Sequence, residues 1–318
     1  MTIAAASVPT PAKAKRGRQP WTAKKKRDFW WGMLFCSPAI IGLLWFTAYP
    51  ILMSLYYSFT SYTMVGHNTH WIGLTNYRVL FHDGTWWSSL QNTFYMMLFL
   101  VPVGIIFALI LALLLNLKVR FQSFYRTIFY LPTIAPLVAS VVAWSYIFDP
   151  QFGVLDDVLR RLHVTAPGWL TDPGWTKPAL VVFGLWGVGN LMIILLAGLQ
   201  EVPVDLQDAA KVDGAGVFSR LRHITVPFMS PYLLFALITG LIAIFQYFTP
   251  PYVLFSSTTG AGPANSAILS SVYLYQNAFV FFKVGYASAM AWCLFVIVAV
   301  ITVVTFRFVG RRVYYAGS

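Results

Sequence analysis

The chain has 318 residues, of which 58% are apolar and only 10% carry a charge. A soluble domain of this length has about a quarter charged residues, so this composition is that of an integral membrane protein. The net charge of +12 does not indicate nucleic-acid binding, because eight basic residues precede Phe29 and no aromatic-basic RNA motif or zinc pattern follows them.

The N-terminal segment, residues 1–29, is predicted to be a basic cytoplasmic tail, and residues 30–318 a transmembrane domain. The apolar stretch after the tail is too long for a cleaved signal and lacks a small-residue cleavage site, so it is expected to stay as an anchor. Cys36 and Cys293 both lie in apolar segments, which argues against a disulfide framework.

Six segments are long and apolar enough to cross a bilayer, since a spanning helix needs about 20 mostly apolar residues. They are residues 31–59, 92–115, 128–148, 178–199, 232–254 and 286–308. The predicted fold class is therefore an all-α integral membrane protein with six transmembrane helices. Pro250 and Pro251 are expected to end or break the fifth helix.

The distribution of Lys and Arg predicts the orientation of these spans. The side richer in Lys and Arg holds the basic tail, the loop at residues 116–127, the loop at about residues 200–231 and the C-terminal end. Both termini are therefore predicted to be cytoplasmic, and residues 200–231 are predicted to form a cytoplasmic loop between the fourth and fifth spans.

The sequence of this cytoplasmic loop predicts two short helices. Pro203 suits a first helical position, Asp205 falls in the first turn, and Gly214 can end the helix in the left-handed conformation. A second helix is expected over residues 217–223, leading to Pro227. Apolar or small residues fall near one face of the first helix: Val202, Leu206, Ala209 and Ala210. The pattern fits either an amphipathic surface connector or a docking element for a cytoplasmic partner.

The same loop resembles the EAA loop of ABC importer permeases. The residues that carry this resemblance are Asp208, Ala209, Ala210, Asp213, Gly214, Ala215, Ile224 and Pro227. In that family the loop forms a coupling helix that docks on the ATPase subunit. The chain has no G-x-x-x-x-G-K-[ST] phosphate loop, so ATP and Mg are expected on a partner chain. No cofactor, metal site or catalytic residue is predicted in this one.

The resemblance extends from about residue 37 to residue 307. Within the family, the chain is similar to the carbohydrate type of permease, represented by the maltose and glycerol-phosphate permeases. Segments 71–81, 124–136 and 258–279 contribute to it. Asp208 stands where the family usually has Glu, and Leu221 where Phe is frequent. The resemblance implies a type I permease bundle, a second permease subunit, an ATPase dimer, an extracytoplasmic solute-binding protein, a bacterial-type inner membrane and a sugar-like solute.

A solute path needs polar groups and aromatic faces inside the apolar spans. Trp186 and Asn190 lie one turn apart in the fourth span, and Gln246, Tyr247 and Thr249 cluster in the fifth. Each polar residue has two interpretations, a hydrogen bond between packed helices or a contact to solute. The resemblance favours the second for the set, because the spans beside the coupling loop line the path in that family.

Two other functions compete with a permease subunit. A secondary transporter usually carries acidic residues inside its spans and an inverted repeat, and neither is found here. A membrane scaffold that recruits a soluble partner through the loop is the other alternative. His67, His70 and His82 lie in one loop, but without Cys or several acids nearby they are interpreted as ordinary loop residues. Gly187 and Gly189 predict tight helix packing or a kink.

Overall fold

The computed structural model describes residues 22–65, 69–117 and 120–314, and within these ranges the secondary structure is helical apart from an isolated bridge between Thr60 and Trp71. The all-α fold class is therefore confirmed. The chain divides into two compact units, residues 1–53 and 54–318.

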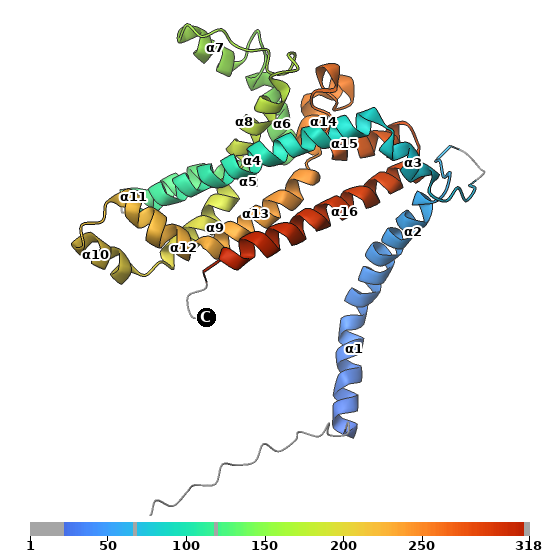
Figure 1. The fold of residues 1–318 in the computed structure, drawn as a ribbon, viewed down its shortest axis with the longest axis horizontal. Helices are drawn as coiled ribbons and strands as arrows, with labels where there is room; N and C mark the ends of the chain where they lie inside the picture. The colour runs from blue at the N-terminus through green and yellow to red at the C-terminus, as the bar shows by residue number, and fades with distance from the viewer. Residues whose placement is uncertain (1–21, 66–68, 118–119, 315–318) are drawn as a thin grey trace, which may run out of the picture. The chain divides into compact units, whose positions relative to one another are not determined.

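The first unit is built on helix α1 (Ala23–Leu43), followed by a π-helical turn η1 (Leu44–Ala48) and the start of α2 (Tyr49–Ser58), as Figure 1 shows. None of the residues of α1 is buried, although most of them are apolar. Such a surface suits a helix surrounded by lipid. Since α1 begins at Ala23, the described end of the predicted tail is helical, whereas residues 1–21 lie outside the described residues.

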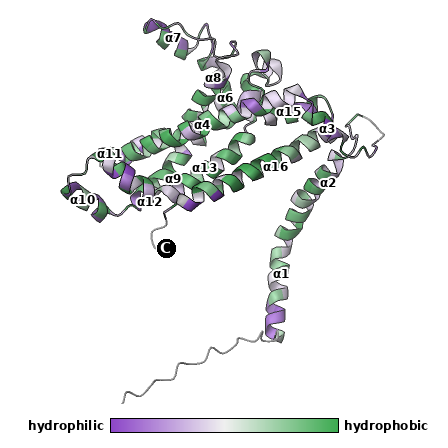
Figure 2. Ribbon diagram, viewed as in Figure 1, coloured by the Kyte–Doolittle hydropathy of each residue, from purple (hydrophilic) through white to green (hydrophobic). Residues whose placement is uncertain are grey.

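The second unit is organised around two long uninterrupted helices, α4 (Gly84–Asn116) and α16 (Val284–Val309), which a 3-10 turn η6 (Gly310–Arg312) follows. Helix α4 packs against α8 (Thr176–Trp186), α9 (Gly189–Gln200) and α13 (Ser230–Phe245), and α13 packs against α16. Both long helices are hydrophobic along most of their length (Figure 2).

Two clusters of buried apolar side chains hold the second unit together. The larger includes Trp86, Phe148 and Leu180, and lies where α4 begins. The smaller includes Leu115 and Met192, and lies where α4 ends. We call the end where α4 begins the far end, and the end where α4 ends the elbow end, because residues 203–228 form a helical elbow there.

Two of the predicted spans are sharply bent. Helices α5 (Gln122–Ile134) and α6 (Leu137–Ile147) meet at 100°, and α8 and α9 meet at 52°. The first break follows from Pro136, because a proline disfavours the helical conformation of the residue before it. Ala135 accordingly has extended angles, φ −66° and ψ 139°. The second break falls at Gly187 and Val188, between the two helices.

The fifth span is interrupted as well, but not where the sequence predicts. Helix α13 ends at Phe245, before the prolines, and α14 (Thr249–Leu254) begins just before them. Pro250 and Pro251 occupy the first turn of α14, where a missing N–H leaves no helical bond unmade. The proline pair therefore begins a short helix instead of ending a long one.

Counted by length and composition, four helical segments could cross a membrane, or up to six if each bent pair is one span. The four are Ala23–Ser58, Gly84–Asn116, Ser230–Leu254 and Val284–Val309. The prediction of six transmembrane helices is met only when the bent pairs α5–α6 and α8–α9 each count as one.

The far end carries six of the short elements of the second unit. These are α3 (Thr75–Phe81), α7 (Val154–Arg161), η3 (Ser256–Thr258), η4 (Pro263–Asn265), α15 (Ser270–Tyr275) and the π-helical turn η5 (Gln276–Val280). Side-chain hydrogen bonds join several of them to the long helices.

Asp83 connects α4 to α15 and α16 at this end. Its Oδ1 accepts hydrogen bonds from the backbone N–H groups of Thr85 at 2.8 Å and Trp86 at 3.3 Å, so it caps α4. Its Oδ2 accepts from the hydroxyls of Tyr273 at 2.5 Å and Tyr286 at 2.6 Å. One carboxylate thus satisfies donors from three helices.

Lys177 and Asn92 form a second connection. The Lys177 ammonium donates to Asn92 Oδ1 at 3.1 Å and to the carbonyl of Ser266 at 3.2 Å. The Asn92 amide donates to the carbonyls of Asn265 at 3.2 Å and Ile268 at 3.0 Å. Helices α4 and α8 are thereby tied to the loop that precedes α15.

Candidate functional site

The predicted cytoplasmic loop forms a helical elbow, residues 203–228. It contains α10 (Val204–Val212), α11 (Val217–Arg220), the π-helical turn η2 (Leu221–Thr225) and α12 (Val226–Phe228). Pro203 is the residue before the first helical position, with φ −59° and ψ 127°, so its prediction is wrong by one residue. Asp205 falls in the first turn as predicted.

The turn after α10 is fixed by Gly214, which has φ +79° as the sequence predicts. The Ala215 N–H donates to the carbonyl of Ala210 at 2.8 Å, and the Gly214 N–H donates to that of Lys211 at 3.1 Å. This pair of bonds is a Schellman motif, which satisfies helix-end carbonyls when the residue after the cap is left-handed. The chain therefore reverses sharply at Gly214.

Helix α10 does not bury an apolar face. None of its residues is buried, and Val212 and Phe218 on the two arms of the elbow are 88% and 75% exposed. Among the predicted coupling residues, Asp208, Ala209, Asp213 and Gly214 are exposed, and Ala210 and Ala215 are half-buried. The expected grouping of Val202 with Leu206 and Ala209 is wrong, because Val202 is buried in the bundle and the other two are exposed.

Asp208 is paired within α10. Its Oδ1 accepts from the Lys211 ammonium at 2.7 Å, and both side chains are more than half exposed. That hydrogen bond, followed by the charge of Lys211, lowers the pKa of Asp208, so the carboxylate is ionised at neutral pH. An ion pair so exposed contributes little to stability.

The second arm of the elbow continues into the bundle. The helix predicted over residues 217–223 does not stop before Pro227, because the π-helical turn lets α12 start afresh with Pro227 in its first turn. Ile224 packs on the smaller core cluster. Gln207 Nε2 donates to Thr225 Oγ1 at 3.1 Å and so links α10 to this arm.

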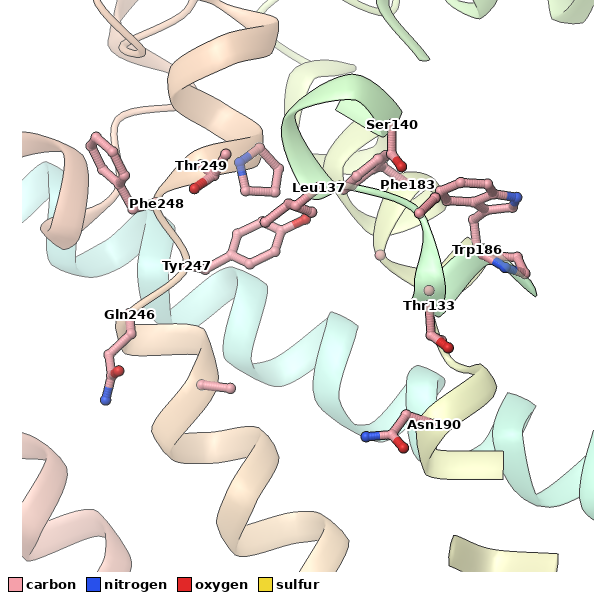
Figure 3. A pocket seen from close by; sticks show the side chains of 16 residues that line it. Thr133, Leu137, Ser140, Phe183, Trp186, Asn190, Gln246, Tyr247, Phe248 and Thr249 are labelled. Carbon is pink, nitrogen blue, oxygen red and sulfur yellow. The ribbon is translucent and has the colours of Figure 1, made fainter. Parts of the chain in front are cut away.

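A cavity of about 400 Å³ lies where the broken spans meet. Figure 3 shows it surrounded by side chains from α5, α6, α8, α9 and the α13–α14 break. The five predicted path residues all line it: Trp186, Asn190, Gln246, Tyr247 and Thr249. The structure thus brings together two groups that the sequence places in separate spans.

The predicted relation between Trp186 and Asn190 is wrong in detail. The sequence places them one turn apart on a continuous helix, but α8 ends at Trp186 and α9 begins at Gly189. They reach the same cavity from two helices on either side of a bend. Gln246 and Tyr247 similarly lie in the break after α13 and not inside a helix.

The glycines at the α8–α9 break allow close packing as well as bending. A Cβ on Gly189 would collide with the carbonyl oxygen of Phe129 and lie 3.0 Å from the Cα of Tyr130. Helix α9 therefore approaches the backbone of α5 more closely than a larger residue would allow. Both outcomes that the sequence predicts for Gly187 and Gly189, a kink and tight packing, are found.

Among the cavity residues that the sequence did not predict, four are polar or aromatic: Thr133, Ser140, Phe183 and Phe248. Thr133 and Ser140 flank the α5–α6 break, so the proline at residue 136 was the available signal. Phe183 lies one turn before Trp186 on α8, and Phe248 lies within the α13–α14 break.

Within residues 22–65, 69–117 and 120–314, no group of three or more His, Cys, Asp or Glu side chains could hold a metal ion. His82 Nδ1 lies 2.8 Å from the carbonyl oxygen of Arg78 in α3. His67 lies outside the described residues.

Comparison with known proteins identifies the family. Residues 101–313, well over half of the chain, match the family model described as the binding-protein-dependent transport system inner membrane component. The chain belongs to this family. The matched residues include the whole elbow and all five predicted path residues.

Curated relatives of this inner membrane component are named as permeases. A probable ABC transporter permease protein of Bacillus subtilis (strain 168) is 39% identical over 91% of this chain and 94% of that protein. The lactose transport system permease protein of Rhizobium radiobacter is 37% identical over 88% of this chain and 94% of its own length. The chain is thus a multi-pass permease of the ABC transporter class.

Solved structures show the same fold. The chain superposes on one of a bacterial alginate ABC transporter, crystallised with an alginate pentasaccharide-bound periplasmic protein, with a TM-score of 0.79. That match covers 91% of this chain and 96% of the other, at 24% identity. The permease fold predicted from the sequence is therefore confirmed.

Proposed function

We propose that this permease is a subunit of an ATP-driven sugar importer, in which the elbow couples to a separate ATPase and the cavity is part of the solute path. Its partners would be a second permease subunit, an ATPase dimer that binds ATP and Mg, and an extracytoplasmic solute-binding protein. The observation that carries the proposal is the gathering of five path residues from two separate spans around one cavity.

The exposed state of α10 supports its role as the coupling element. A helix whose residues are all accessible, fixed by a Schellman turn and connected to the bundle by the second arm, can contact a partner without unfolding anything else. Asp208, Ala209, Ala210, Asp213, Gly214 and Ala215 would form the contact. Ile224 and Pro227 would transmit its movement, since they lie where the elbow joins the bundle.

The chemistry of the cavity supports a carbohydrate path. Sugars bind proteins through hydrogen bonds to hydroxyl groups and through stacking on aromatic rings, and the lining offers both. Relatives carry sugar names, such as the lactose permease and the arabinooligosaccharides transport system permease protein of Bacillus subtilis (strain 168).

The distribution of basic residues supports an orientation with the elbow and both termini in the cytoplasm. Lys24, Lys25, Lys26 and Arg27 open α1, and Lys and Arg residues lie also in the elbow and after α16. Lys and Arg residues near span ends are enriched on the cytoplasmic side.

The coupling role is tested with a pair of proline variants. The tagged chain is purified in mild detergent with its co-purifying ATPase, and ATP hydrolysis is measured for Gly214→Pro and Gly216→Pro. Gly214 has φ +79°, which proline cannot adopt, and its N–H is hydrogen-bonded to Lys211. Gly216 has φ −65°, which proline prefers, so it is the matched control.

We expect the permease to stimulate ATP hydrolysis by the co-purifying ATPase. Gly214→Pro should abolish this stimulation, and Gly216→Pro should keep it. An absence of any co-purifying ATPase, under conditions that keep the chain folded, would refute the importer and favour a membrane scaffold. A genomic neighbour that encodes a phosphate-loop ATPase would argue for the importer.

The path role is tested with Asn190→Ala and Gln246→Ala. Both should lower solute uptake while the assembled complex still forms, because neither side chain is hydrogen-bonded to another residue that the structure describes. If either variant instead loses complex formation, its amide holds helices together and does not contact solute.

A further inference from the structure

We infer that the cavity selects an uncharged polyhydroxy solute and discriminates against acidic sugars. This inference rests on the proposed function, because it takes the cavity to lie on the solute path. It specifies the charge of the solute, which neither the fold nor the family specifies. The fold itself leaves that class open, since a transporter of the same fold imports the acidic polysaccharide alginate.

The first observation is the absence of charge from the lining. None of the described residues that line the cavity is Asp, Glu, Lys, Arg or His, although the cavity lies among spans of a basic chain. A carboxylate or sulfonate entering it would leave water without gaining a cationic partner, and an unpaired charge is costly to bury. A neutral hydroxyl incurs no such penalty when it finds a hydrogen-bond partner.

The second observation is the arrangement of helix ends around the cavity. Helices α5 and α8 end there, and α6 and α9 begin there. Helix ends leave carbonyl groups without helical partners, and helix starts leave N–H groups in the same state. Since starts and ends occur together, their partial charges oppose each other and favour neither anion nor cation. A hydroxyl suits such a site because it donates and accepts.

The third observation is a buried hydroxyl without a partner. Within the described residues, the Tyr247 hydroxyl oxygen is buried and makes no hydrogen bond. Figure 3 shows its ring extending from the α13–α14 break into the cavity, toward Leu137 and Phe183. An unsatisfied buried hydroxyl is destabilising, and a turn of the Tyr247 ring toward the cavity would let a solute hydroxyl supply the missing bond. Trp186 and Phe248 add aromatic faces on which the C–H face of a sugar ring can stack.

The experiment uses matched pairs of sugars that differ in one charged group. The purified importer is titrated with glucose and glucuronate, galactose and galacturonate, and lactose and lactobionate, and binding is followed by tryptophan fluorescence. Trp186→Phe identifies the part of the signal that comes from the cavity. We expect the neutral member of at least one pair to bind about tenfold or more tightly than its acid.

A charge-gain variant gives the converse measurement. Asn190→Lys adds a cation to the cavity, so it should raise the affinity for the acid relative to the neutral sugar by about tenfold. Asn116→Lys makes the same substitution at the end of α4, away from the cavity, and should leave the ratio unchanged. Should Asn190→Lys fail to assemble, Gln246→Lys, also on the lining, replaces it with Gln151→Lys in an exposed loop as its control.

Two results would contradict different claims. Acidic members binding as tightly as their neutral partners, or an unchanged ratio in both cavity lysine variants, would overturn the charge preference and leave the carbohydrate path intact. If no sugar of either kind changes the fluorescence of Trp186, the proposed carbohydrate path fails, and the charge preference fails with it.

Discussion

The far end and the elbow end of the second unit are held by different kinds of contact. At the far end, Asp83 and Tyr273, which are 190 positions apart in the chain, share a hydrogen bond, and Lys177 reaches Asn92 across 85 positions. At the elbow end, Gln207 to Thr225 is the one side-chain hydrogen bond that joins α10 to another element, among the residues that the structure describes.

The difference indicates which part of the permease can move alone. Long-range polar bonds in half-buried surroundings make the far end a single piece, because breaking one leaves other groups unsatisfied. The elbow has few such bonds, so it can shift without that cost. Substitutions at the far end should therefore lower global stability, and those at the elbow should change local order.

The largest expected effect is at Asp83. Asp83→Ala removes the acceptor of four hydrogen bonds and strands two tyrosine hydroxyls, so it should lower the free energy of unfolding by about 3 kcal/mol. Urea unfolding in detergent measures it. Asp172→Ala is the control, because Asp172 is exposed and its side chain accepts only the N–H of Gly174, for about 0.5 kcal/mol. If the two variants lost equal amounts of unfolding free energy, the far end would not behave as a single piece.

A smaller effect is expected at the cavity. Gly189→Ala places a methyl group against the backbone of α5, and overpacking of this kind costs about 2 kcal/mol. In Gly104→Ala the new Cβ would meet only Val188, at 4.0 Å, and alanine favours the helix, so stability should not fall. The same unfolding measurement compares them. A free energy of unfolding that is unchanged in Gly189→Ala would show that α9 can move away from α5.

At the elbow the effect should be local. Gly214→Ala forces a side chain into the left-handed region, at about 1 kcal/mol, whereas Gly216→Ala at φ −65° carries no such strain. Neither new Cβ has a neighbour within 4 Å, so only the backbone angle differs. Hydrogen exchange of the Ala215 N–H should quicken severalfold in the first variant alone. A matching fall in global stability would mean that the elbow is not independent.

The smallest effect is a dependence on acidity. Burial alone raises the pKa of Asp83, but hydrogen bonds from Tyr273, Tyr286 and two backbone N–H groups outweigh it and hold the pKa below its ordinary value of 3.8. A carboxyl with a lowered pKa in the folded state contributes stability above its unfolded pKa and loses it as the pH falls through the folded one.

The free energy of unfolding should therefore be independent of Asp83 above about pH 5 and decline below about pH 4. In Asp83→Asn that part of the decline should vanish, which unfolding curves at several pH values can measure. A decline of the same size in both proteins would assign it to other carboxyl groups.

The sequence predicts much of this fold because its signals are local. Apolar length marks the spans, and Gly214 marks the turn through its own backbone preference. The bend between Trp186 and Asn190 was harder to place, since its position depends on how closely Gly189 approaches α5. Periodicity alone treats the two residues as neighbours on one helix.

The role of Asp83 could not be predicted for a different reason. Its position before α4 is a typical helix cap, and nothing near it in the sequence indicates a further partner. Tyr286 lies 203 positions away and reaches the carboxylate only after the spans have packed. Likewise, the polar groups of the fourth and fifth spans were recognised separately, and only packing around the broken helices shows that they share a cavity.

The broken spans have a mechanical consequence. Helix α4, with 33 residues, is a continuous strut about 50 Å long, so a thrust along its axis displaces both ends alike. Helix α13 ends at a joint beside the cavity, and the α5–α6 and α8–α9 pairs are jointed there too. A force transmitted through a broken span rotates its two helices relative to each other at the break. Displacement of the elbow would then change the shape of the cavity, while the uninterrupted helix α4 keeps its own length and form.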